Sequence, residues 1–415
     1  MKYLLLSLCL CCLLPAGWAG ERVLEFAGDE IGIETHPAQG ERLLLWLPSE
    51  FGLSPRQRPT AEGLAKLGIE VWMPDLHAAF FIAPGRYSLN EIDPQLLVAL
   101  IEDALGSGKQ VFILSQGRVS ALALQAVRRY QQSGKPTARL RGLLAFSPRL
   151  YLRTPQGGEA AQFLPIASAS NLPLYLLQPQ AAGTFWRIGR IAEVLGSGGS
   201  PVFIHTLPQV GDGFHLRPEF TPAEAAMTGR LPPILAHAMS QLDDFGGVPA
   251  QAAAMLGEET APQANSGSAL LKPYPGERQA PSLALPMLDG AQLDLRDLQG
   301  KVVLVNFWAT WCPPCVEEIP SLQRLYRATR AQGLEILAVD VGETPQQMHD
   351  FLADKPIDFP VLMDVDGSAL KTWGVHAFPT TLVLDRTHRI RYAVFGAFDW
   401  NSAEVRAAIA PLLAE

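Results

Sequence analysis

Two cysteines, Cys312 and Cys315, are the residues of this 415-residue chain with the clearest capacity for chemistry. Two prolines separate them, in the order Trp311-Cys312-Pro313-Pro314-Cys315. In a Cys-x-x-Cys pair, the first thiolate can attack a partner disulfide, and the second thiol is close enough to resolve the mixed disulfide that forms. The spacing therefore predicts thiol-disulfide exchange through a redox-active Cys312–Cys315 disulfide.

The residues around the pair predict which cysteine is the nucleophile. The apolar run at residues 301–308 is typical of a buried strand, and a helix is expected from Pro313, because proline is tolerated in a first helical turn. Cys312 would then lie at a helix N-terminus, where the helix dipole and free N–H groups lower the pKa of a thiol below about 8.5. Cys312 is therefore expected to attack and Cys315 to resolve.

Zinc binding and a purely structural disulfide are the alternatives for this pair. A structural zinc site needs two further Cys or His ligands. The other cysteines, Cys9, Cys11 and Cys12, all lie in the first dozen residues, and the nearby histidines are scattered. A disulfide across four residues also constrains little chain entropy. We therefore expect redox chemistry without a metal or an organic cofactor, and a binding protein with a structural disulfide is the alternative.

The last third of the chain, residues 277–415, resembles a thioredoxin-fold domain, most closely the extracytoplasmic TlpA/ResA-like thiol-disulfide oxidoreductases. The matching motifs lie in Ala280–Leu322, which includes VNFWATWCPPC, and in Trp373–Asp385. A peroxiredoxin, the nearest alternative within this fold, carries a Pro-x-x-x-Thr-x-x-Cys pattern. Here Thr310 stands only two residues before Cys312 and no proline precedes it, so a peroxiredoxin is not expected.

The resemblance implies further site residues. Pro379 matches a cis-proline that faces the cysteines in that family, and Trp311 would shape the docking surface. Glu318 matches a glutamate that would act as acid or base for the buried thiol. The alternative for Glu318 is a first-turn helix residue favoured only by the helix dipole, with Glu317 as its solvated neighbour. Asn306, where many thioredoxins carry a buried Asp, suits the same branch.

Residues 22–245 alternate apolar runs with helical patterns, which predicts a mostly parallel sheet covered by helices, and hence an α/β domain. Strands are expected at residues 42–48, 70–75, 110–115, 142–147, 172–178 and 202–207. Helices are expected at residues 61–67, 94–105, 118–132, 186–195 and 234–242. In residues 277–415, strands are expected at 301–308, 334–341, 359–363, 380–384 and 390–395, and helices at 313–332, 345–355 and 402–413.

The first domain resembles an α/β-hydrolase that lacks its catalytic residues. Val111–Leu124 has the strand, turn and helix of a nucleophile elbow, but Gly117 occupies the nucleophile slot and both flanking glycines are missing. Ser115 and Ser120 lie two or three residues from that slot. His215 stands near the place of the base, and no acid follows the strand at 172–178. We expect a non-catalytic module, and a serine hydrolase with an accessory redox domain is the alternative.

The remaining segments set the domain boundaries and the compartment. Residues 1–19 read as an export signal, with an apolar run too short to span a membrane and small residues Gly17 and Ala19 at a cleavage site. The alternative interpretation of these residues is an uncleaved membrane anchor. Residues 246–276 are rich in Ala, Pro and Gly, which is typical of a linker. The formal net charge of −8 argues against a nucleic-acid partner.

These features together predict a periplasmic protein-disulfide reductase with a CPPC dithiol. The resemblance suggests protein substrates such as apocytochrome c or proteins with metal-site cysteines, and re-reduction by a membrane thiol carrier of the DsbD type. The direction of electron flow is not determined by the residues, so an oxidase or isomerase is the alternative within the same chemistry.

Overall fold

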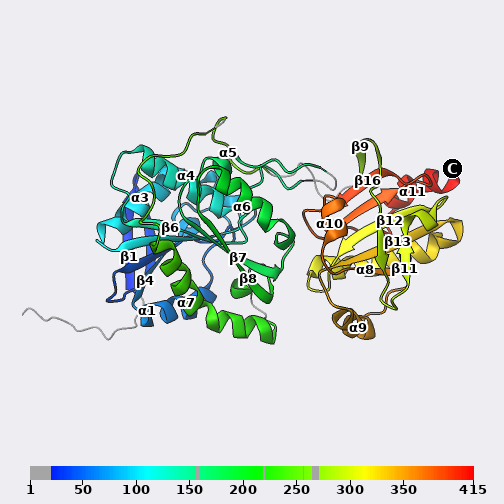
Figure 1. The fold of residues 1–415 in the computed structure, drawn as a ribbon, viewed down its shortest axis with the longest axis horizontal. Helices are drawn as coiled ribbons and strands as arrows, with labels where there is room; N and C mark the ends of the chain where they lie inside the picture. Colours follow the sequence, from blue (N-terminus) through cyan, green and yellow to red (C-terminus); the bar gives the residue numbers. More distant parts are fainter. Residues whose placement is uncertain (1–19, 156–158, 218–219, 256, 264–270) are drawn as a thin grey trace, which may run out of the picture.

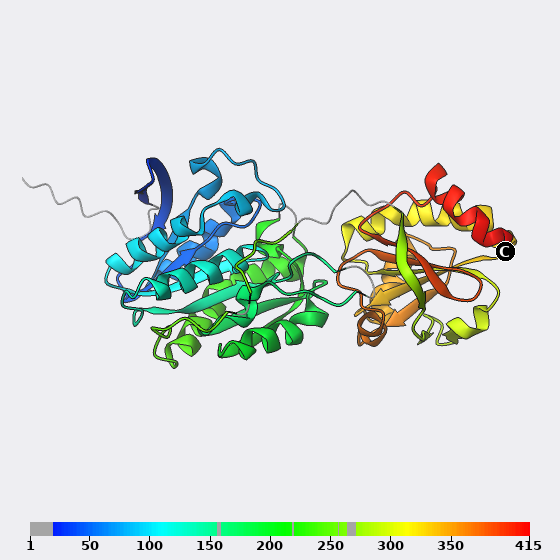
Figure 2. The same cartoon turned by 90° about the horizontal axis from the view of Figure 1, so that it is seen from above.

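The computed structural model describes residues 20–155, 159–217, 220–255, 257–263 and 271–415, so the predicted export signal at residues 1–19 lies outside the described residues. Two α/β domains stand side by side, and the C-terminus lies on the far side of the smaller domain (Figures 1 and 2). None of the helices in these ranges is long and apolar enough to cross a membrane.

The larger domain is built on an eight-stranded sheet with the order β1-β2-β4-β3-β5-β6-β7-β8. Its strands are β1 (Gly20–Phe26), β2 (Asp29–His36), β3 (Arg42–Trp46), β4 (Ile69–Pro74), β5 (Gln110–Gln116), β6 (Leu140–Phe146), β7 (Leu174–Ala181) and β8 (Val202–Gly211). Only β1 and β2 run antiparallel to their neighbours. The mostly parallel sheet predicted from the continuous apolar runs is confirmed, and the hairpin β1–β2 extends it beyond the prediction.

Helices cover both faces of this sheet, which is why its central strands are apolar on both sides. The helices are α1 (Arg58–Lys66), α2 (Leu76–Ala79), α3 (Pro94–Gly106), α4 (Val119–Gln132), α5 (Pro165–Ser168), α6 (Ile188–Ser197) and α7 (Pro222–Asp243). The core on one face includes α3, α4 and α6, and the core on the other face includes α1 and α7. Helix α7 is longer than the predicted helix at residues 234–242, because it begins at Pro222 and continues through Pro232 and Pro233.

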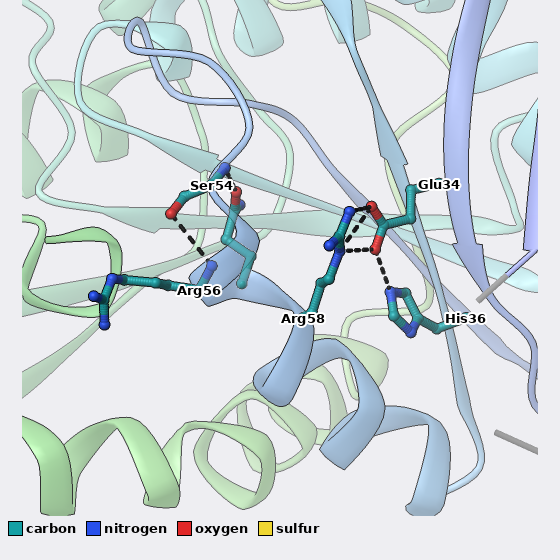
Figure 3. A network of polar contacts seen from close by, with 6 residues as sticks. Glu34, His36, Ser54, Arg56 and Arg58 are labelled. Atoms are coloured by element: carbon teal, nitrogen blue, oxygen red, sulfur yellow. Dashed lines mark hydrogen bonds and ion pairs between the residues drawn. The ribbon is translucent and has the colours of Figure 1, made fainter. Parts of the chain in front are cut away.

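A polar network holds the loop between β3 and α1 (Figure 3). Glu34 on β2 accepts hydrogen bonds from Arg58 Nε at 2.9 Å, and its Oε1 lies 3.1 Å from His36 Nε2. Ser54 accepts a hydrogen bond from the backbone N–H of Arg56 at 3.3 Å, as the cap of a short 3-10 turn. The loop after β3 is therefore anchored at its far end, where the chain enters α1.

The smaller domain is built on a six-stranded sheet with the order β14-β13-β12-β15-β16-β9. The strands are β9 (Lys272–Gln279), β12 (Val302–Trp308), β13 (Leu334–Val341), β14 (Val361–Asp364), β15 (Thr380–Leu384) and β16 (Arg389–Phe395), with a separate hairpin of β10 (Ala284–Pro286) and β11 (Gln292–Asp294). The helices are α8 (Pro313–Thr329), α9 (Pro345–Asp354), α10 (Ser368–Thr372) and α11 (Ala403–Ala414). The core on one face includes α8 and α11, and the core on the other includes α10. This is the thioredoxin fold that the sequence predicted.

The segment predicted as a linker is bound to the larger domain along most of its length. We call residues 248–255 and 257–263 the strap. Its first bond joins Val248 N to Leu140 O at 2.8 Å, and its last joins Gln263 N to Leu152 O at 2.6 Å. The second half of the prediction also differs, because β9 begins at Lys272 and pairs with β16, five residues before the predicted domain boundary at 277. The composition of the segment could not reveal these backbone hydrogen bonds, because they require no periodic pattern of side chains.

The two domains contact each other through the 3-10 turn Phe185–Arg187, directly before α6. Trp186 packs against Gly342 and Gly367 of the smaller domain so closely that a Cβ on these glycines would lie 2.6 and 2.5 Å from its ring. Arg187 donates hydrogen bonds to the backbone oxygens of Leu370, at 3.3 Å, and Val375, at 3.0 Å. These contacts hold the carboxyl end of the larger sheet against the face of the smaller domain that carries the cysteines.

Candidate active site

The cysteine pair lies where the sequence predicted it, between a buried strand and a helix. Strand β12 ends at Trp308, Cys312 is the N-cap of α8, and Cys315 lies within the first turn of α8. The two sulfurs form a disulfide at 2.07 Å. Cys312 is 6% exposed, whereas Cys315 is 1% exposed. Of the two sulfurs, that of Cys312 is therefore the one a partner can reach first.

The other residues of the predicted docking surface surround Cys312. The Phe378–Pro379 peptide bond is cis, as the resemblance implied. Pro379 directly precedes Thr380, which pairs with Phe307 near the end of β12 that leads to the cysteines. Trp311 contacts Phe378 edge to face, with ring centroids 5.6 Å apart. The exposed Pro313 and Pro314 line the same cleft as Trp311 and Cys312.

Glu318 is a buried carboxyl on the helix face that carries Cys315. It lies three residues after Cys315, a spacing that places two side chains on one face of a helix. Only 3% of it is exposed, and it lies in the second turn of α8. Burial raises the pKa of Glu318 from 4.5 to about 7, against the opposing effect of its hydrogen-bond donors. Glu318 is therefore a buried residue of the second turn and not the first-turn residue of the alternative, whereas Glu317 is exposed as expected.

Three donors from different elements point at the Glu318 carboxyl. Asn306 Nδ2 donates to Oε1 at 2.8 Å, and it also donates to Thr381 Oγ1 at 2.8 Å. Trp400 Nε1 and the backbone N–H of Phe398 donate to Oε2, each at 3.2 Å. Because these donors are fixed by β12 and by the segment before α11, they orient the carboxyl whether it is protonated or ionised. The group is thus held in one position while it can still exchange a proton near neutral pH.

Sequence reasoning missed a buried acidic pair, Asp340 and Glu343, next to the cysteine loop. Glu343 accepts hydrogen bonds from the backbone N–H of Thr310 at 2.6 Å and from its hydroxyl. Burial and then Glu343 raise the pKa of Asp340 well above its usual value. Asp340 pairs in register with Trp308 on the neighbouring parallel strand. The sequence did carry a signal for this pair, because both acidic residues lie at the carboxyl end of the apolar strand that neighbours β12.

A strand, a turn and a helix follow one another at Gln110–Gln132, where the sequence resembled a nucleophile elbow. Gly117, between β5 and α4, has a φ of +56°, the left-handed conformation that glycine tolerates best. Ser115 and Ser120 are buried and lie 2.9 Å apart, Oγ to Oγ. His215 is buried too, with its ring centroid 4.6 Å from that of Phe146, and burial lowers its pKa to about 4. Neither ring nitrogen of His215 has a hydrogen-bond partner among the described residues, so the ring contacts no serine hydroxyl or carboxylate there.

Comparison with known proteins places the smaller domain. The model of the AhpC/TSA family matches residues 277–393. The thiol-disulfide oxidoreductase ResA of Bacillus thuringiensis subsp. konkukian is 35% identical over 119 residues, 29% of this chain and 69% of that protein. ResA of Bacillus subtilis is 38% identical over 117 residues, 28% of this chain and 65% of that protein. The structure of a secreted thiol-disulfide isomerase from Corynebacterium glutamicum is 24% identical, with a TM-score of 0.33, over 36% of this chain and 95% of that one.

The fold and the disulfide at the start of α8 define a thioredoxin-fold thiol-disulfide oxidoreductase. More narrowly, the chain belongs to the ResA family of thiol-disulfide oxidoreductases.

Proposed function

We propose that this protein is a periplasmic protein-disulfide reductase in which Cys312 attacks, Cys315 resolves and Glu318 carries the proton of Cys315. The observation that carries the proposal is the asymmetry of the pair: Cys312 lines a cleft, whereas Cys315 is 1% exposed and shares a helix face with a buried carboxyl. A solvent-excluded thiol needs a nearby base to become a thiolate.

Each step of the proposed reaction balances. In the dithiol form, the Cys312 thiolate attacks one sulfur of a substrate disulfide, so a mixed disulfide forms and one substrate thiolate leaves. Glu318 then accepts the proton of the Cys315 thiol, and the resulting thiolate attacks Cys312 Sγ. The second substrate thiolate leaves, and the protein retains the Cys312–Cys315 disulfide. Two electrons pass to the substrate, and a thiol donor must restore the dithiol.

The compartment and the partners follow from the export signal and the family resemblance. We place the mature chain in the periplasm, released from the signal at residues 1–19, with protein thiols or disulfides as substrates. Apocytochrome c and proteins with metal-site cysteines are the expected classes, and a membrane thiol carrier of the DsbD type is the expected electron donor. The roles of Trp311 and Pro379 are to receive the substrate chain beside the cysteines. The larger domain is proposed to be a non-catalytic, hydrolase-like module.

The reduction potential of the pair tests the direction of electron flow. A reductase should equilibrate near the value of thioredoxin, about −270 mV, and a strong oxidant near that of DsbA, about −120 mV. The potential is measured by equilibrating the full chain in glutathione or dithiothreitol buffers. A value close to −120 mV would identify an oxidase and refute the proposed direction.

Two cysteine variants test the roles within the pair. Cys315→Ser should accumulate mixed disulfides with substrate proteins, because attack proceeds and resolution cannot. Cys312→Ser should show neither turnover nor trapped partners. Full activity of Cys312→Ser would remove the assigned nucleophile and leave the structural-disulfide alternative.

A further inference from the structure

The disulfide opens into a cleft between the two domains, with a volume of about 680 Å³. The smaller domain contributes the predicted docking surface, including Trp311, Cys312 and Phe378. The larger domain contributes the opposite wall. A volume of this size falls within the range of sites that enclose ligands, about 300–1,000 Å³. The reactive sulfur therefore faces a built cleft rather than open solvent.

The opposite wall is the carboxyl edge of the larger sheet. Arg118 follows β5, Arg149 and Tyr151 follow β6, and Arg217 follows β8. In open α/β sheets this edge is where ligands bind. The edge that would carry a hydrolase site is thus turned toward Cys312, although it holds no assembled triad.

The wall carries an excess of positive charge. Four arginines and one aspartate line the cleft: Arg86, Arg118, Arg149, Arg217 and Asp212. The excess is local, because the whole chain has a net charge of −8. Burial and then Arg187 lower the pKa of His376, which also lines the cleft, to about 4, so that this imidazole is neutral at pH 7.

Three of the four guanidinium groups already have a carboxylate partner. Arg118 Nη1 lies 2.9 Å from Glu50 Oε1, Arg149 Nη2 lies 2.9 Å from Asp212 Oδ2, and Arg217 pairs with Glu224.

Arg86 is the exception. Arg86 is exposed, and within the described ranges its side chain forms no hydrogen bond or ion pair. One cation of the cleft is therefore available to a bound carboxylate without breaking an internal pair.

We infer that this cleft binds an acidic polypeptide segment next to the substrate disulfide, and that Arg86 is a specificity-determining residue. The inference rests on the proposed function, because it names the substrates of the same cysteine pair. Guanidinium groups pair with carboxylates through two parallel hydrogen bonds, and Trp311, Tyr87 and Tyr151 supply aromatic surface around them. The larger domain is then a substrate-selecting wall, which gives it a role without catalysis of its own.

The test compares two synthetic peptides, each closed by one disulfide, that differ only at four positions flanking the cysteines. These positions hold Glu in the acidic peptide and Lys in the basic one. The reduced full chain should reduce the acidic peptide with a kcat/KM at least tenfold higher, and added salt should shrink this preference. Arg86→Gln should lower kcat/KM for the acidic peptide by up to about fivefold, the upper end of what one exposed ion pair contributes. Arg86→Glu should lower kcat/KM for the acidic peptide further and raise kcat/KM for the basic peptide.

Arg230 on α7 provides the matched control, because it is an exposed arginine that does not line this cleft. Arg230→Gln should leave both peptides unchanged. Equal kcat/KM values for the two peptides, or an equal loss for both in Arg86→Gln, would overturn the inference while leaving the reductase intact. Reduction of neither peptide above the rate of Cys312→Ser would instead overturn the proposed function.

Discussion

Replacement of Glu318 by glutamine isolates the proton-transfer role of this buried carboxyl. With its pKa raised from 4.5 to about 7, about half of Glu318 is protonated at pH 7, instead of about 0.3% at the ordinary value. Such a group can both accept and return a proton at neutral pH. Glutamine keeps the size and can still accept hydrogen bonds from Trp400 and Phe398, while Asn306 turns its amide to accept from the new NH₂ group. The variant should therefore fold and lose only the ionisable proton.

The expected effect falls on the resolution step. In a single-turnover reaction of the reduced chain with a disulfide peptide, stopped-flow fluorescence separates formation of the mixed disulfide from its resolution. In the parent, the resolution rate should rise with an inflection near pH 7. In Glu318→Gln, the inflection should vanish and the rate at pH 7.5 should fall about 100-fold, the low end of general acid–base contributions. Attack by Cys312 should change less than twofold.

Glu317→Gln is the matched control, because Glu317 is the exposed neighbour on the same helix. It should leave both phases unchanged. If Glu318→Gln keeps the inflection near pH 7, another group carries the proton and the reasoning fails.

The same raised pKa has a consequence for stability. A carboxyl whose folded pKa lies above its unfolded pKa destabilises the fold once it ionises: the penalty is absent below about pH 4.5, grows up to about pH 7 and stays constant above it. The shift corresponds to about 3 kcal/mol. Hydrogen exchange of peptides from α8 should therefore show Glu318→Gln to be more protected than the parent at pH 8.5, by up to about 3 kcal/mol, and no more protected at pH 4.5. Equal protection at pH 8.5 would contradict the burial argument.

Two further predictions concern the larger domain. Gly117→Ser should produce no hydrolysis of p-nitrophenyl acetate, because His215 is buried against aromatic rings. The substitution should also destabilise the chain by about 1 kcal/mol, because residue 117 has a φ of +56°. Measurable turnover that requires His215 would restore the hydrolase alternative. Arg187→Met should remove the two hydrogen bonds to Leu370 and Val375 and so weaken the contact between the domains by about 3 kcal/mol. The radius of gyration measured by solution X-ray scattering should then increase. An unchanged radius would show that other contacts hold the domains together.

The sequence predicted the elements whose signal is local. Strand β13 at Leu334–Val341 and strand β15 at Thr380–Leu384 have the predicted bounds, because apolar runs end at turn residues on both sides. The position of Cys312 at the start of α8 followed from the tolerance of proline in a first turn. These features depend on a few neighbouring residues, which is why they could be read without the fold.

Features that depend on tertiary packing could not be read in the same way. The strap looked like a linker because Ala, Pro and Gly carry no periodic pattern, yet its backbone bonds to the larger domain. The contact between Glu343 and Thr310 joins residues 33 positions apart. The charge of the cleft arises only when loops after several strands meet. The raised pKa of Glu318 likewise comes from burial, which a spacing rule does not measure.

The strap limits how far the dithiol can travel. Among the described residues its last bond to the larger domain is at Gln263, and β9 begins at Lys272; the nine Cα–Cα steps between these two residues can span at most about 32 Å. If the docking contacts break, the smaller domain remains on this short tether, at a millimolar effective concentration relative to its own wall. Redocking is then an intramolecular event, which weak contacts can sustain. Under the proposed function, the thiol donor that restores the dithiol must in turn reach Cys312 within that radius.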